Sequence, residues 1–414
     1  MSKKIQVFLL SSSMLIIVFA LIGGLGVHAS SGNGVSASSD NVYTHIEVYS
    51  EVLHRIRSEY VEEPNMGLVT SGALHGLLES LDADSSYLSP AEYKAFKQNK
   101  SDGKAGIGAT ISKRFGYAAV VSVIPGGPAD KAGINPGDIL ETVNGKSTHD
   151  LSLAAIKTEL TGEQGSRLEA VLIRTRKVEP QKITIVREVV NPPAVTDQEM
   201  ADGVGYIKAL ALTKGRAQDI AGKIKSLQKE GAKKLVLDLR NDSLGDEEEG
   251  VAVANLFLGK GTITYLQGQK YDKQVFNADP AKKITDLPVA VVVNRGTSGA
   301  AEIVAAALLD NGRGEVVGDK TFGEGSVQKL IEVPDGSALI LSVAKYYTPK
   351  GKVIQDTGIT PSVLAASADE LTPVVDDEDS AAPEEPQQKT TPKDDDQLRR
   401  AIDVLKAKTA QPKS

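Results

Sequence analysis

Neither thiol nor imidazole chemistry is open to the second half of this chain. The 414 residues include no cysteine, and the five histidines all lie at or before position 149: His28, His45, His54, His75 and His149. Disulfides, thiol catalysis and thiolate metal sites are therefore excluded. Catalysis in the C-terminal half must do without imidazole, which leaves hydroxyl, amine and carboxyl groups to carry it.

Acidic residues predominate, yet their spacing does not suggest a metal site. The run at residues 246–249, Asp-Glu-Glu-Glu, lacks ligand spacing and is interpreted as the solvated start of a helix. No metal or organic cofactor is expected. The net charge of −7 provides no basic face for nucleic acid, and with 4% aromatic residues and no Trp a platform for stacking bases is not expected.

The first 29 residues have the character of a targeting segment. Lys3 and Lys4 precede a long apolar stretch that ends in Val27-His28-Ala29. This pattern predicts either a signal peptide cleaved after Ala29 or an uncleaved membrane anchor, because the stretch could also span a bilayer. Both alternatives predict an exported protein, periplasmic or extracellular, which a membrane anchor would hold at the membrane.

The remaining chain is long enough for two or three domains, and its 41% hydrophobic and 24% charged residues are typical of a globular protein. A linker rich in Ser and Gly (30–42) precedes a stretch with helical periodicity (43–103). Short β segments follow (104–190), and then alternating strands and helices that predict an α/β core with a mainly parallel sheet (191–364). An acidic, disordered linker (365–393) leads to a C-terminal helix (394–414) whose apolar stripe predicts a packing surface.

The β-rich segment resembles a PDZ domain. The resemblance rests on the phrase from Pro125 through Gly137-Asp138-Ile139-Leu140 to Val143-Asn144-Gly145. It implies that the loop Gly106-Ile107-Gly108-Ala109 offers backbone N–H groups to the terminal carboxylate of a polypeptide, which would add a strand to the sheet edge. Glycines suit such a loop because the backbone must approach the anion closely.

The order of helical segment, PDZ domain and α/β core resembles the carboxyl-terminal processing, or tail-specific, serine protease family. The segments that carry this resemblance include residues 80–90, 236–241, 294–302, 318–323, 344–349 and 358–361. The implied fold is an α/β multidomain protein, in which a PDZ β-domain is inserted before an α/β core of the crotonase/Clp-like ββα type, after a helical N-terminal segment.

By this resemblance, the family's serine nucleophile and lysine base are both replaced here. The family pattern Asn-x-x-Ser-Ala-Ser-Ala-Ser-Glu, aligned on Asn294 and Glu302, places the catalytic serine at Gly299. The family's Phe-Gly-Lys-Gly reads Phe322-Gly323-Glu324-Gly325, so the lysine position is Glu324. The supporting positions Asp310 and Gln328 are retained. The Asn-Pro-Gly-Gly loop, implicated in binding substrate and oxyanion, reads Asp242-Ser243-Leu244-Gly245.

Neighbouring residues could take over the chemistry only with a change of geometry. Ser298 is one residue before the nucleophile position, about 100° around a helix, so its hydroxyl would point elsewhere. We therefore expect Ser298 to cap the helix, although it is the candidate alternative nucleophile. Lys320 is expected to be a solvated loop residue.

Three hypotheses follow from the sequence. The leading one is a pseudoprotease that binds polypeptide C-termini through its PDZ domain and acts as a scaffold or as a regulator of a partner protease or envelope protein. The second is an active serine-type endopeptidase that uses Ser298, and the third is a structural envelope protein. The family resemblance also suggests a homodimer.

Overall fold

The structure is a computed structural model that describes residues 42–99, 104–114, 116–174, 177–366 and 395–410. The predicted leader and nearly all of the two predicted linkers lie outside the described residues. Within the described ranges, no helix has both the length and the apolar character needed to cross a bilayer. The chain divides into two compact units between Val69 and Thr70.

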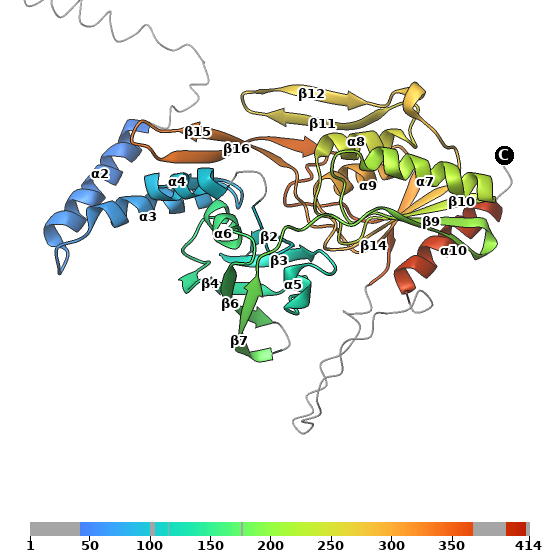
Figure 1. The fold of residues 1–414 in the computed structure, drawn as a ribbon. Helices are drawn as coiled ribbons and strands as arrows, with labels where there is room; N and C mark the ends of the chain where they lie inside the picture. Colours follow the sequence, from blue (N-terminus) through green and yellow to red (C-terminus); the bar gives the residue numbers. More distant parts are fainter. Residues whose placement is uncertain (1–41, 100–103, 115, 175–176, 367–394, 411–414) are drawn as a thin grey trace, which may run out of the picture. The chain divides into compact units, whose positions relative to one another are not determined.

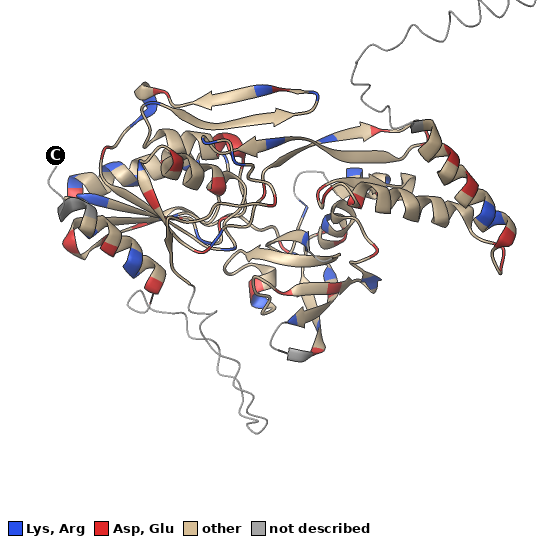
Figure 2. Ribbon diagram, turned by 180° about the vertical axis from the view of Figure 1, so that it is seen from behind, with Lys and Arg blue, Asp and Glu red and all other residues tan. Residues whose placement is uncertain are grey.

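Helix α2 (Val42–Glu59) belongs to the first unit, and α3 (Met66–Glu79) begins there. Arg55 forms ion pairs of 2.7 Å with both Glu51 and Glu59, one turn away on either side. Acidic and basic residues are intermixed along α2 (Figure 2). Such i, i+4 pairs stabilise an exposed helix by a few tenths of a kcal/mol each, about 0.2–0.5 kcal/mol.

In the second unit, a short strand follows α3 that the helical interpretation of residues 43–103 missed. Strand β1 (Ser86–Leu88) pairs antiparallel with β16 (Ala338–Tyr347), and this pairing over 250 residues of sequence explains why local periodicity could not reveal it. Helix α4 (Pro90–Asn99) starts with a capping box, in which the Ser89 N–H donates to Glu92 Oε2 at 2.8 Å.

The predicted PDZ segment folds as one antiparallel sheet with two helices. The strand order is β2-β3-β4-β6-β7, with β5 paired to β4, so β2 forms one edge. The bounds are β2 Ala109–Arg114, β3 Tyr117–Val123, β4 Ile139–Val143, β5 Lys146–Ser147, β6 Arg167–Arg174 and β7 Lys177–Val186. Helices α5 (Pro128–Lys131) and α6 (Leu153–Leu160) complete it.

The α/β core contains the predicted parallel sheet, in the order β17-β14-β13-β10-β9-β8. All neighbours are parallel except β8 and β9, which pair antiparallel. The strands are β8 Thr196–Met200, β9 Val204–Lys208, β10 Lys234–Asp238, β13 Val289–Val293, β14 Gly314–Gly318 and β17 Val363–Leu364. Strand β13 is buried along its whole length, which explains its unbroken run of apolar residues.

Helices cover both faces of this sheet (Figure 1). On one face α7 (Arg216–Glu230), α8 (Glu247–Asn255) and α9 (Ala300–Asp310) pack against alternate strand residues such as Leu235 and Val291. On the other face α10 (Asp396–Ala410) packs Leu398, Ala401 and Leu405 against the intervening set. The apolar stripe predicted for the C-terminal helix is therefore a packing surface.

Polar contacts hold the start of α10 in place. Arg240, which follows β10, forms ion pairs with Asp238 at 2.6 Å and with Asp395 at 2.7 Å. Gln397 donates to Asp319 Oδ2 at 2.9 Å. These contacts join the C-terminal helix to the loops that follow β10 and β14.

Beside the mainly parallel sheet, the core has a second sheet that is antiparallel and was not predicted. Its order is β1-β16-β11-β12, and β15 also pairs with β16. The strands are β11 Thr262–Gly268, β12 Tyr271–Asn277 and β15 Ser326–Glu332. Two short 3-10 helices, Ala201–Gly203 and Pro280–Lys282, lie between other elements of the core.

Candidate functional site

Two loops meet where β10 and β13 end, at the edge where α/β sheets carry functional groups. The Asn241 N–H donates to Asn294 Oδ1 at 2.9 Å, and Asn294 Nδ2 donates back to Asn241 Oδ1 at 2.9 Å. Thr297 Oγ1 donates to the Leu239 carbonyl at 2.8 Å. These bonds fix the chain between β13 and α9, where the family pattern locates the nucleophile.

Gly299 caps α9 in a conformation that favours glycine. Its φ is +59° and its ψ is −119°, a region in which a side chain would be strained. A Cβ atom placed on Gly299 would nevertheless meet nothing within 4 Å. The sharp strand-to-helix turn is therefore present with open space beside it, and no hydroxyl fills that space.

Glu302 joins this turn to the loop after β14. Its fully buried carboxylate accepts hydrogen bonds from the N–H groups of Gly299 (3.0 Å), Gly323 (2.8 Å) and Glu324 (2.8 Å), and from the Thr321 hydroxyl. Burial raises the pKa of Glu302 to about 8, although these donors act in the opposite direction. From the sequence, Glu302 was expected only to mark the end of the family's serine-containing pattern. A Glu at the third position of a helix was the signal for this capping role.

Ser298 does not cap α9 as predicted, because Gly299 occupies the N-cap position. Its hydroxyl instead donates to Glu324 Oε2 at 2.5 Å, and its N–H donates to the Asp242 carbonyl at 2.8 Å. Ser298 is 1% exposed. Its hydroxyl is thus buried and bonded to a carboxylate at the position where the family has its lysine.

The other predicted site residues form hydrogen bonds with other partners or are exposed. Lys320 is exposed, as expected for a loop lysine. Gln328 is exposed on β15, where its Nε2 donates to Ser326 Oγ at 2.7 Å. Asp310 ends α9, about 16 Å along the helix from Gly299, and accepts a hydrogen bond from the Lys350 N–H at 3.0 Å.

Carboxyl groups surround Glu324. The pKa values of Asp84 and Glu247 are both raised, first by burial and then by the charge of Glu324. The described residues nevertheless include no group of three or more acidic or histidine side chains placed to hold a metal ion.

Glu249 is not fully solvated, although the acidic run at residues 246–249 was predicted to be. Its carboxylate accepts hydrogen bonds from the Gly215 and Ala217 N–H groups at the start of α7.

The loop after β10 contains a buried carboxyl group, Asp242, that differs from Glu302 in its hydrogen bonding. Asp242 is fully buried, and among the residues that the structure describes neither of its carboxylate oxygens has a hydrogen bond of good geometry. Burial raises its pKa well above the ordinary value, and the nearby N–H groups of Leu212 and Leu244 offset only part of this effect. The next residue, Ser243, donates to Thr110 Oγ1 of β2 at 2.7 Å.

The predicted carboxylate-binding loop precedes the edge strand β2. Gly108 has a φ of +72°, and the Gly106 N–H donates to the Glu188 carbonyl at 3.0 Å. Ile107 is buried, and Ala109 begins β2. Because β2 pairs on one side only, with β3, its other side is an edge to which an extended chain could add.

Comparisons with known proteins agree with this architecture. Residues 203–365 match Peptidase family S41, and residues 120–174 match the PDZ domain. The chain is 34% identical to the carboxy-terminal processing protease CtpA of Bacillus subtilis (strain 168), over 77% of this chain and 69% of that protein. It is 32% identical to the carboxy-terminal-processing protease of Bartonella bacilliformis, over 79% of this chain and 76% of that protein.

A solved structure is also similar. The photosystem II D1 C-terminal processing protease matches with a TM-score of 0.64 at 26% identity, covering 77% of this chain and 92% of that one. The PDZ domain, the α/β core and their order along the chain are thus shared with solved and curated relatives. The chain belongs to the carboxy-terminal processing protease family, with a PDZ domain and a Peptidase family S41 core.

Proposed function

We propose that this chain is a non-catalytic member of its family that binds polypeptide C-termini. The observation that carries the proposal is the hydrogen bond from Ser298 to Glu324 beside a glycine at position 299. A lysine base activates a serine because its neutral, desolvated amine accepts the proton of the serine hydroxyl. At this point the chain offers a carboxylate and a buried hydroxyl instead.

The retained function is the capture of a polypeptide end by the PDZ domain. A free carboxylate would bind N–H groups of residues 107–109, because that of Gly106 already donates to the Glu188 carbonyl, and the chain before the carboxylate would pair with the edge of β2. The captured protein would be held rather than cut, so the chain would act as a scaffold or as a regulator of a partner protease or envelope protein. Export through residues 1–29, cleaved or retained as an anchor, and assembly as a homodimer are part of the same proposal.

Two other functions compete with this one. An active endopeptidase would need Ser298 as its nucleophile, but its 1% exposure speaks against an attack on a peptide carbonyl. A structural envelope protein would need the PDZ groove to be blocked. The free edge of β2 speaks against that alternative.

Binding and chemistry can be measured on the same purified protein. We expect no hydrolysis of an unstructured protein substrate, no labelling by a serine-directed fluorophosphonate, and saturable binding of a fluorescent peptide with an apolar C-terminal residue. The same peptide with a C-terminal amide is the control and should bind weakly. Stoichiometric labelling that disappears in Ser298→Ala would establish the endopeptidase, and absence of saturable binding would favour the structural protein.

A further inference from the structure

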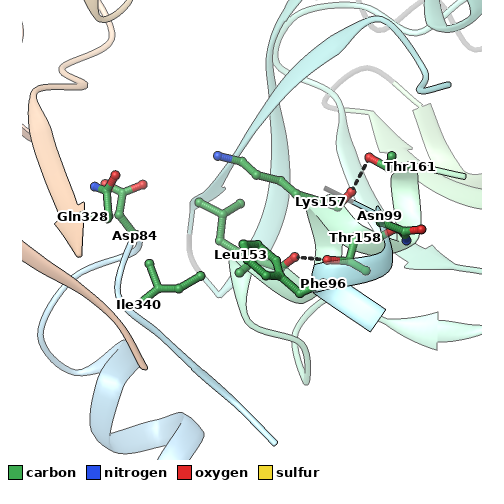
Figure 3. A pocket seen from close by; sticks show the side chains of 10 residues that line it. Asp84, Phe96, Asn99, Leu153, Lys157, Thr158, Thr161, Gln328 and Ile340 are labelled. Atoms are coloured by element: carbon green, nitrogen blue, oxygen red, sulfur yellow. Dashed lines mark hydrogen bonds between the residues drawn. The ribbon is translucent and has the colours of Figure 1, made fainter. Parts of the chain in front are cut away.

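A pocket of about 300 Å³ opens between α4, α6 and the β15–β16 pair (Figure 3). Its walls are largely apolar and come from all three elements: Phe96, Leu153, Ala154 and Ile340. This volume is at the lower end of the range for ligand pockets, about 300–1,000 Å³. Because α6 packs against β2 as well as α4, the pocket lies on the same helix that borders the peptide-binding edge of the PDZ domain.

Most polar groups of the pocket on the α6 side are already paired. The Thr158 hydroxyl donates to the Ala154 carbonyl at 2.8 Å, and the Thr161 hydroxyl donates to the Lys157 carbonyl at 2.9 Å. Asn99 Nδ2 donates to the Thr158 carbonyl at 3.0 Å. The hydroxyl protons of both threonines and one N–H of Asn99 are therefore already used.

The amine of Lys157 is different. Figure 3 shows it extending from α6 toward the side of the pocket where Asp84 and Gln328 lie. Across the described residues, no hydrogen bond or ion pair engages its Nζ, and no other Lys or Arg lines the pocket. An ammonium group at the border of an apolar pocket attracts an anionic partner.

Asp84 is not the anionic partner of the Lys157 amine. Its Oδ2 accepts hydrogen bonds from Ser326 Oγ at 3.0 Å and from Gln355 Nε2 at 3.1 Å. Its carboxyl thus belongs to the opposite wall, and the charge of Lys157 reaches it without a direct contact. The space between the two side chains is open to a ligand group.

We propose that this pocket binds an inner segment of the captured polypeptide in which an apolar side chain adjoins an acidic one, and that Lys157 selects the acidic residue. The apolar side chain would pack against Leu153 and Ile340, and the carboxylate would pair with the Lys157 amine. The inference rests on the proposed function, because the PDZ domain must first hold the C-terminus. The pocket would add a preference for an acidic residue at one position before the C-terminus of the bound polypeptide.

A peptide series tests the preference on the full-length protein. Fluorescent peptides share one apolar C-terminal residue, and a Leu-Glu pair is moved one position at a time away from it, with Leu-Gln and Leu-Lys versions of each. At one position we expect the Glu peptide to bind about fivefold more tightly than the Gln peptide, as for an exposed ion pair of about 1 kcal/mol. High salt should reduce the difference.

Reversing the charge of residue 157 tests whether Lys157 causes this preference. Lys157→Glu should invert the preference at that position, so that the Lys peptide binds most tightly. Lys229→Glu, an exposed lysine on α7 that does not line the pocket, is the control and should leave the preference unchanged. If all peptides bind equally at every position, or if Lys157→Glu keeps the preference for Glu, the inference is wrong while the proposed function stands. If no peptide binds at all, both are wrong.

Discussion

Two buried carboxyl groups beside the turn at Gly299 have opposite surroundings. Glu302 accepts four hydrogen bonds from the turn and from the loop after β14, whereas Asp242, in the loop after β10, has none of good geometry. Both are fully buried. A satisfied buried group stabilises a unique geometry, and an unsatisfied one costs free energy. The contrast indicates that hydrogen bonds keep the frame around Gly299 intact, whereas the loop after β10 provides no comparable partner for the Asp242 carboxyl among the described residues.

The largest effect on stability is expected when the Glu302 carboxylate is removed. Glu302→Ala would leave three N–H groups and the Thr321 hydroxyl without an acceptor, so we expect a loss of about 4 kcal/mol in the free energy of unfolding. Urea denaturation measures it. Glu248→Ala, an exposed residue of α8, is the control and should change stability by less than about 0.5 kcal/mol. Equal effects of the two variants would mean that Glu302 does not hold the frame.

The second test restores the missing groups. If the frame is intact, Gly299→Ser with Glu324→Lys should gain fluorophosphonate labelling and raise peptide hydrolysis about 100-fold above the parent chain. The open space beside Gly299 admits the hydroxyl, although the backbone there adds strain. Each single variant is a control and should remain inactive. A folded double variant that is neither labelled nor active would show that the defect extends to the loop after β10.

The third test uses pH. The folded protein, with the pKa of Glu302 at about 8, holds a proton that the unfolded chain releases above the ordinary pKa of 4.5. Stability from this group is therefore present at low pH and lost as pH rises toward 8, by about 2 kcal/mol between pH 6 and pH 8. Glu302→Gln should lack this contribution. An identical pH profile for the variant, measured by denaturant midpoints, would argue that Glu302 stays ionised throughout.

The smallest effect is expected at Asp242. Asp242→Asn replaces an unpaired buried carboxyl by an amide that cannot ionise, and should stabilise the protein by about 1 kcal/mol at pH 8, where the raised pKa costs most. Thermal or urea unfolding of both proteins at pH 5 and pH 8 measures it. A loss of stability at both pH values would show that the carboxyl has a partner which the contrast with Glu302 overlooks.

Sequence alone predicted much of the fold because local patterns and short connections determine those parts. The apolar run of β13, the capping box at Ser89 and the helix at residues 217–230 were each visible in consecutive residues. Strands β1, β11, β12, β15 and β16 were missed. The pairings of β16 with β1 and with β11 join segments far apart in the chain. The hairpins β11–β12 and β15–β16 are local, but β12 is exposed along most of its length and lacks an apolar pattern. At the site, the placement of the nucleophile and base positions at Gly299 and Glu324 stays a prediction from the family resemblance. Ser298 was wrongly assigned to the helix cap, because its hydrogen-bond partner Glu324 lies 26 residues away.

The attachment of the C-terminal helix has a practical consequence for protein production. Leu398, Ala401 and Leu405 cover Val236, Ala290 and Val292 of the central sheet, and Arg240 depends on Asp395 for one of its ion pairs. A recombinant protein stopped at residue 366 would leave this face of the sheet open to water and to other chains. We therefore expect such a shortened protein to aggregate during purification, and it should regain solubility when residues 395–410 are supplied as a separate peptide.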